Sequence, residues 1–138
     1  MTVAKRILVI EDEIILQDVY KLVLTSGGYS VHVANNGIEG LKKLKSVQPD
    51  LILLDIFMPL MDGREFLRNL DLSQYPDTKI IVYTNLSDKQ TQTEMRELGA
   101  HDCIVKSSMT PSDLLAVVAK HLGKDSGKND AAKRQTNR

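Results

Sequence analysis

The sequence has little of what stabilises secreted or membrane-bound proteins. Its 138 residues include a single cysteine, Cys103, so no disulfide can form within the chain, and one free thiol suits a reducing compartment. No apolar run approaches the roughly 20 residues that span a bilayer, and no basic region with a following apolar stretch marks a signal peptide at the N-terminus. We therefore expect a soluble cytoplasmic protein that makes no contact with a membrane.

The sequence also lacks an excess of charge of either sign. Eighteen Lys and Arg residues balance eighteen Asp and Glu residues. This balance does not favour nucleic acid or an anionic membrane surface as a partner. A chain of this length is one domain of ordinary size, and it can bury a sizeable core without disulfides or a structural metal.

Short apolar runs alternate with amphipathic segments along most of the chain. The apolar runs are typical of β-strands and cover residues 5–10, 29–34, 51–55, 78–84 and 101–106. The amphipathic segments are typical of helices and cover residues 13–26, 36–46, 63–71, 87–98 and 111–122. Strict alternation with short loops indicates parallel strands and right-handed crossovers. We predict an α/β fold of the flavodoxin-like (βα)5 kind, a doubly wound parallel sheet of five strands in the order 2-1-3-4-5.

Several residues indicate the faces and ends of these helices. In the first helix the apolar residues at helical spacing are Ile15, Val19, Leu22 and Val23. In the last helix we expect burial of Leu114, Leu115, Val118 and Leu122. Ser87 is a candidate N-cap for helix 87–98, and Thr110 followed by Pro111 is a favourable start for helix 111–122. Residues 124–138 carry no large apolar side chain, so we predict a folded domain over 1–123 and a polar, disordered tail over 124–138.

Polar side chains follow four of the predicted strands. Glu11 and Asp12 follow the first strand, and the third, fourth and fifth strands end at Asp55, Thr84 and Lys106. In an open parallel sheet the ligand site lies beyond the carboxyl ends of the strands, so we expect these side chains to meet. Clustered carboxylates repel one another unless a cation is present, and oxygen ligands suit Mg²⁺. One acid in such a place is usually a solvated loop residue or a helix cap, as Asp12 could be, but three acids together with Lys106 favour a binding site.

The motifs around these residues resemble those of the receiver domain of two-component response regulators. The matching segments are Ile7–Glu13, Asp55–Gly63 with its Met58-Pro59 and Asp62-Gly63 pairs, Thr84, Gly99-Ala100 and Lys106. The resemblance covers about residues 5–122, and the segment that begins at Asp55 is strongly specific.

The resemblance implies a role for each site residue. Asp55 would accept a phosphoryl group from a phosphohistidine on a sensor histidine kinase or a histidine phosphotransfer protein. Asp12, Asp55 and the main-chain carbonyl of Phe57 would hold Mg²⁺, and Glu11 would act on the metal through water. Thr84 and Lys106 would bind the phosphoryl oxygens.

The resemblance also implies a phosphorylation-dependent signalling switch and not an enzyme with a separate substrate. Because no second folded domain follows, we expect output through contact with a downstream protein and no nucleic acid binding by this chain. Family members often pair through the face that corresponds to residues 87–98, 101–106 and 111–122, so a homodimer formed on phosphorylation is a further expectation.

One departure from the family pattern and the residues at two flanking positions bear on the site. Cys103 stands three residues before the lysine, where the family usually has an aromatic residue whose ring swings inward on phosphorylation. Tyr83 could substitute for that ring, although we expect it to be a partly buried strand residue. Phe57 and Leu86 occupy two positions whose residues flank the acyl phosphate in the family. Neither side chain can orient an attacking water, so we expect the phosphorylated form to be long-lived.

Three other interpretations remain. The chain could be the receiver part of a larger hybrid kinase or regulator. It could be a Mg²⁺-dependent phosphohydrolase with an aspartate nucleophile, but those enzymes typically carry a second aspartate two residues later, where this sequence has Phe57. It could also be a folded interaction module that is never phosphorylated, against which the intact Asp12, Asp55, Thr84 and Lys106 argue.

Overall fold

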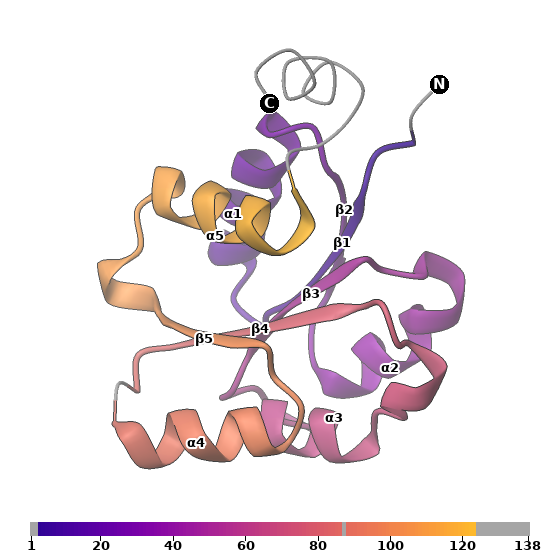
Figure 1. Ribbon diagram of the computed structural model, residues 1–138, viewed down its shortest axis with the longest axis vertical. Helices are drawn as coiled ribbons and strands as arrows, with labels where there is room; N and C mark the ends of the chain where they lie inside the picture. Colours follow the sequence, from indigo (N-terminus) through magenta and orange to yellow (C-terminus); the bar gives the residue numbers. More distant parts are fainter. Residues whose placement is uncertain (1–2, 87, 124–138) are drawn as a thin grey trace, which may run out of the picture.

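A five-stranded parallel sheet runs through the middle of the molecule in the computed structural model, which describes residues 3–86 and 88–123 (Figure 1). The strands are β1 (Arg6–Ile10), β2 (Ser30–Ala34), β3 (Leu51–Asp55), β4 (Lys79–Thr84) and β5 (Asp102–Val105). All neighbouring pairs are parallel, and the order β2-β1-β3-β4-β5 confirms the prediction.

Five α-helices cover the sheet, two on one face and three on the other. They are α1 (Ile14–Ser26), α2 (Gly37–Val47), α3 (Gly63–Asn69), α4 (Lys89–Glu97) and α5 (Pro111–Leu122). Figure 1 shows α1 and α5 together on one side and α2, α3 and α4 on the other. Short 3-10 turns at Leu72–Gln74 and Lys106–Ser108 complete the order of elements. This is the doubly wound arrangement that the alternation of strands and helices predicts.

The core lies in two layers, one on each face of the sheet. Residues 7–10 of β1 and 51–54 of β3 are fully buried, as expected for central strands that are covered on both faces. Alternate residues of each strand point into opposite layers. Leu8 and Ile10 belong to the layer under α2, α3 and α4, while Ile7 and Val9 belong to the layer under α1 and α5.

Of the four apolar residues predicted to mark one face of helix α1, Val23 packs against the core, but the other three lie on a side that faces away from the sheet. Ile15 and Leu22 are 78% and 73% exposed, and Val19 is 43% exposed, whereas Tyr20 and Leu24 are buried. The prediction was wrong because α1 carries apolar residues on two sides, and the side with Tyr20 and Leu24 faces the sheet. The other side leaves an exposed apolar stripe that begins in the first turn of α1, shortly after the end of β1.

The helix starts follow local capping rules. Thr110 caps α5 in a reciprocal pair of hydrogen bonds with Asp113, and Pro111 occupies the first turn, as predicted. The side chain of Asp88 caps α4. Ser87, which we predicted as that cap, and the predicted tail 124–138 lie outside the described residues.

Candidate functional site

The strand register brings Glu11, Asp55 and Tyr83 into one row across the sheet. Ile10 of β1 pairs with Leu54 of β3, so the next residues, Glu11 and Asp55, are neighbours, and Asp55 pairs with Tyr83 of β4. Residues that pair in neighbouring strands point to the same face. These three side chains therefore share the face that α1 and α5 cover, at the carboxyl end of the sheet.

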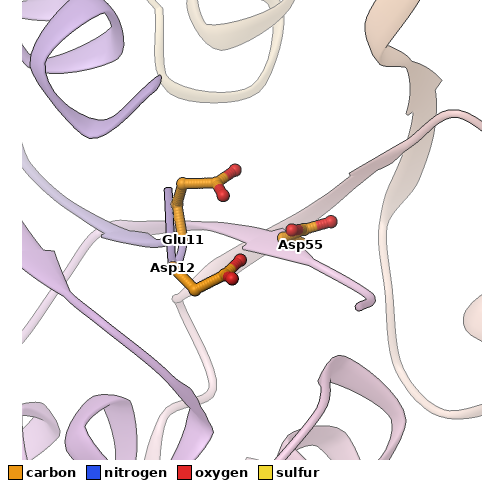
Figure 2. A group of neighbouring side chains, drawn as sticks. All are labelled: Glu11, Asp12 and Asp55. Carbon is orange, nitrogen blue, oxygen red and sulfur yellow. The ribbon is translucent and has the colours of Figure 1, made fainter. Parts of the chain in front are cut away.

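Three carboxylates meet at this end of the sheet, as the sequence predicted. Glu11, Asp12 and Asp55 each offer an oxygen within 4.8 Å of the other two (Figure 2). Glu11 is fully buried and Asp55 is 5% exposed, while Asp12 is more exposed. Asp12 does not cap α1, whose N-cap is Glu13.

The carboxylates destabilise one another's charged forms. Burial, followed by the charge of Glu11, raises the pKa of Asp55 from its ordinary value of 3.8 to about 6, although Lys106 opposes the shift. Burial and the charge of Glu11 also raise the pKa of Asp12. An oxygen-only set under mutual repulsion, with one more exposed member that leaves room for water, fits Mg²⁺, which retains part of its water shell.

Lys106 lies between two of the acids. Its Nζ atom is 3.2 Å from Glu11 Oε1 and 3.4 Å from Asp55 Oδ2, and its side chain is 13% exposed. Burial alone would lower the pKa of Lys106, but the charges of Asp55 and Glu11 outweigh burial and raise it. The group is therefore a stable ammonium that is shared between the carboxylates of Glu11 and Asp55.

Thr84 ends β4, the strand next to β3, and is 1% exposed. Its Oγ1 accepts a hydrogen bond from the Leu86 main chain over 3.2 Å. A hydroxyl also has one hydrogen to donate, so Thr84 keeps a donor for another acceptor. Four of the five predicted strand-end residues make the site, and Thr84 borders it without a described contact to Asp55.

The loop after β3 carries Phe57, whose main-chain carbonyl is the remaining predicted metal ligand. Its ring is 58% exposed, two residues after Asp55. The loop ends at Gly63, whose main-chain N–H donates to the Ile56 oxygen over 2.7 Å. A Cβ atom on Gly63 would overlap the main-chain oxygen of Asp55, so glycine allows α3 to begin against the end of β3. Asp62 caps α3 in a reciprocal pair of hydrogen bonds with Glu65.

Tyr83 is a site residue whose role the sequence analysis missed. We expected a partly buried strand residue, but Tyr83 is fully buried and its hydroxyl donates to Glu11 Oε1 over 2.8 Å. Its ring packs edge-on against Tyr20, with centroids 5.2 Å apart, and Lys106 Nζ lies 4.9 Å from the centroid of Tyr83. Burial, together with the neighbouring Glu11, raises the pKa of Tyr83 well above its ordinary value, so the hydroxyl remains a neutral donor. The available sequence signal was its place one residue before Thr84.

Glu11 is held by further donors that the sequence did not indicate. Its Oε2 atom accepts from the Glu13 main chain over 2.9 Å. Its main-chain oxygen accepts from Gln17 Nε2 over 2.5 Å, and the same amide nitrogen donates to Asn35 Oδ1 over 2.7 Å. These contacts fix the position of a fully buried charge beside Asp55.

Cys103, at the position where the resemblance implies an aromatic residue, is a partly buried side chain. It packs against the core layer under α2, α3 and α4. Burial raises the pKa of its thiol. Cys103 is therefore a packing residue, and it offers no ring that could swing toward Thr84.

No helix in residues 3–86 and 88–123 is long and apolar enough to span a bilayer. The helices instead serve to cover the sheet and to place the site at its edge.

The amino-acid sequence is similar to those of many known proteins. Residues 7–119 match the family model described as the response regulator receiver domain. A probable C4-dicarboxylate response regulator, DctR, from Halalkalibacterium halodurans is 40% identical over 103 residues, which make up 73% of this chain and 44% of that protein. The chain thus spans less than half the length of this relative.

Two of the similar solved structures agree with the fold. The chemotaxis protein CheY4 of Vibrio cholerae matches with a TM-score of 0.80 and 29% identity, over 86% of this chain and 98% of that chain. The signal receiver domain of a signal transduction histidine kinase from Syntrophus aciditrophicus matches with a TM-score of 0.75 and 33% identity, over 86% of this chain and 90% of that chain. With the family match over residues 7–119, this chain belongs to the response regulator receiver domains.

Proposed function

We propose that this domain is a phosphorylation-dependent signalling switch that accepts a phosphoryl group on Asp55. The observation that carries the proposal is the place of Asp55, a nearly buried carboxylate at the end of β3 with Lys106 Nζ 3.4 Å away and two further acids beside it. A carboxylate is a competent nucleophile for phosphorus when nearby cations balance the charge of the incoming group.

In the proposed transfer, an oxygen of Asp55 forms a bond to phosphorus while the bond between phosphorus and the donor atom breaks. The donor atom keeps the electron pair, and for a phosphohistidine it is a ring nitrogen. Lys106 binds a phosphoryl oxygen, and the hydroxyl of Thr84 donates to another. Asp12, Asp55 and the Phe57 main-chain carbonyl would hold Mg²⁺, and Glu11 would act on the ion through water. The bound ion would neutralise charge on the transferring oxygens.

The donor in this proposal is a sensor histidine kinase or a histidine phosphotransfer protein, as the family implies. Exposed apolar side chains follow two of the strands whose ends carry site residues. Ile14 and Ile15 begin α1, the helix after β1, and Phe57 and Leu60 lie in the loop after β3. Exposed apolar side chains in these segments favour contact with a protein partner over contact with a small molecule alone.

Output would pass through a downstream protein or through a second copy of the chain. The face made by α4, β5 and α5 is the expected pairing surface. Asp102 of β5 ties this face together, since it lies 3.0 Å from His121 Nε2 of α5 and 3.8 Å from an Arg96 nitrogen of α4. A shift of β5 would therefore reach both helices. The chain could equally serve as the receiver part of a longer regulator or hybrid kinase.

The test is incubation of the purified protein with acetyl phosphate and Mg²⁺, with phosphate incorporation followed by mass spectrometry. We expect one phosphate per wild-type chain, none in Asp55→Asn, and wild-type incorporation in Asp77→Asn, which alters an exposed acid far from the site along the chain. Continuous release of phosphate would favour the phosphohydrolase. No incorporation would favour the unphosphorylated interaction module, and phosphate at the wild-type level in Asp55→Asn would refute the assignment of Asp55.

A further inference from the structure

The buried side chain of Tyr83 contacts the residues on both sides of the phosphoacceptor. Its hydroxyl donates to Glu11 Oε1 over 2.8 Å, and its ring lies under the ammonium of Lys106, 4.9 Å from Nζ to the ring centroid. An ammonium at this distance from an aromatic face is attracted to it. Tyr83 thus touches both the buried acid and the cation that lie next to Asp55.

Glu11 Oε1 accepts from two donors, the hydroxyl of Tyr83 and the ammonium of Lys106, so the two groups share the stabilisation of this oxygen. Lys106 Nζ is 3.2 Å from that oxygen and 3.4 Å from Asp55 Oδ2, so one ammonium serves two carboxylates. Glu11 is fully buried, and a buried charge that loses a hydrogen-bond partner is costly. Without the hydroxyl of Tyr83, Oε1 would depend on Lys106 alone and would hold the ammonium more tightly, at the expense of Asp55.

We propose that Tyr83 is a positioning residue for phosphoryl transfer: its hydroxyl supplies Glu11 with a second donor, which leaves Lys106 shared with Asp55 and available to an incoming phosphoryl oxygen. This inference rests on the proposed function of Asp55. As the Asp55 oxygen bonds to phosphorus and the leaving group departs with its electron pair, Lys106 must turn toward the phosphoryl oxygens. Tyr83 keeps Glu11 hydrogen-bonded while Lys106 makes that movement.

Tyr83 can perform this role because its ring is held in place. The ring is fully buried and packs edge-on against Tyr20 at an interplanar angle of 81°. Tyr83 is also the residue of β4 that pairs with Asp55 of β3. Substitution by phenylalanine removes the hydroxyl and keeps this packing. Tyr20→Phe is the matched control, because within the described part of the chain the Tyr20 hydroxyl makes no hydrogen bond to Glu11.

The first test measures phosphorylation by acetyl phosphate over a series of Mg²⁺ concentrations. In Tyr83→Phe we expect the maximal rate to fall about tenfold, the scale of one lost hydrogen bond to a charged group, with no rise in the half-saturating Mg²⁺ concentration. The affinity for trifluoroberyllate, a phosphoryl mimic measured by fluorine NMR, should fall by a similar factor. Tyr20→Phe should keep the wild-type rate and affinity. A wild-type rate and affinity in Tyr83→Phe would overturn the proposal.

A double-mutant cycle separates this role from a loss of packing. In a Glu11→Gln background the side chain at that position no longer attracts Lys106 by charge, so adding Tyr83→Phe should have little further effect on the trifluoroberyllate affinity. The same loss in both backgrounds would show that Tyr83 acts through packing and would overturn the proposal.

A third measurement does not depend on phosphorylation. In a proton–nitrogen NMR spectrum of the lysine ammonium groups, recorded without a phosphodonor, the Lys106 signal should shift in Tyr83→Phe and stay in place in Tyr20→Phe. An unmoved Lys106 signal in Tyr83→Phe would overturn the sharing of the ammonium. A different outcome would separate the two proposals. If the Lys106 signal shifts in Tyr83→Phe but the wild type takes no phosphate on Asp55, the proposed function is overturned, and the role of Tyr83 in transfer is overturned with it.

Discussion

Replacing Asp55 by asparagine should stabilise the protein at neutral pH. The folded protein holds a proton at Asp55 more tightly than the unfolded chain does, because the pKa of Asp55 rises from 3.8 to about 6 on folding. Raising the pH through this window therefore lowers the free energy of unfolding. One pKa unit corresponds to about 1.4 kcal/mol, so the charged carboxylate costs up to about 3 kcal/mol above pH 7.

Asp55→Asn removes the charge and keeps the shape of the side chain. At pH 8, without divalent cations, we expect the free energy of unfolding to rise by as much as about 3 kcal/mol, or the melting temperature by roughly 10 °C for a domain of this size. At pH 4.5 the wild-type carboxyl is already protonated in the folded state, so the gain should fall to less than half. Asp77→Asn, at an exposed site, should change stability by no more than about 0.5 kcal/mol at either pH.

The assay is urea unfolding followed by circular dichroism, which suits a chain that has no tryptophan. The two pH values are compared within each variant, because other carboxyl groups also titrate between them. An Asp55→Asn variant that is no more stable than wild type at pH 8, or that gains the same amount at pH 8 and pH 4.5, would refute the reasoning from buried charge.

Mg²⁺ should raise the melting temperature of the wild type by relieving repulsion among the acids, and Asp12→Ala should lose most of that gain; an undiminished gain in the variant would place the cation elsewhere. Lys106→Ala should still be phosphorylated by acetyl phosphate, roughly 100-fold more slowly, since one charged donor to the phosphoryl oxygens is gone. Its β5 amides should show a smaller change in hydrogen exchange with trifluoroberyllate than those of the wild type, and equal changes would argue against coupling through Lys106. Phe57→Asn combined with Leu86→Glu should speed loss of phosphate about tenfold or more, because polar side chains can orient a water toward the acyl phosphate. Equal rates in wild type and double variant, measured by phosphate release, would rule out apolar shielding.

The covered parallel sheet and the meeting of the acids were predictable for a physical reason. Uninterrupted apolar runs occur where a strand is buried on both faces, and parallel strands bring their carboxyl ends to one edge. Glu11, Asp12, Asp55 and Lys106 could therefore be placed together without knowledge of any side-chain conformation. The motif that begins at Asp55 indicated the receiver family, and the match of the family model over residues 7–119 confirmed it.

The packing face of α1 and the contacts of Tyr83 could not be predicted from the sequence. Helix α1 carries apolar side chains on two sides, and the choice between them depends on how it sits against the sheet and α5. The hydrogen bond from Tyr83 to Glu11 depends on the pairing of Asp55 with Tyr83, which is a matter of register between strands. Residue patterns predict that a strand is buried, but they do not give the register that brings a particular hydroxyl to a particular carboxylate.

Thr84 accepts a hydrogen bond from the main chain of Leu86, and this ties the threonine to the loop that follows β4. If Asp55 accepts a phosphoryl group, as proposed, the Thr84 hydroxyl can donate its hydrogen to a phosphoryl oxygen while its oxygen still accepts from Leu86. One hydroxyl would then join the loop after β4 to the modified end of β3. A substitution that removes this hydroxyl would break both contacts at once, so its effect on the loop and its effect on phosphoryl binding could not be separated.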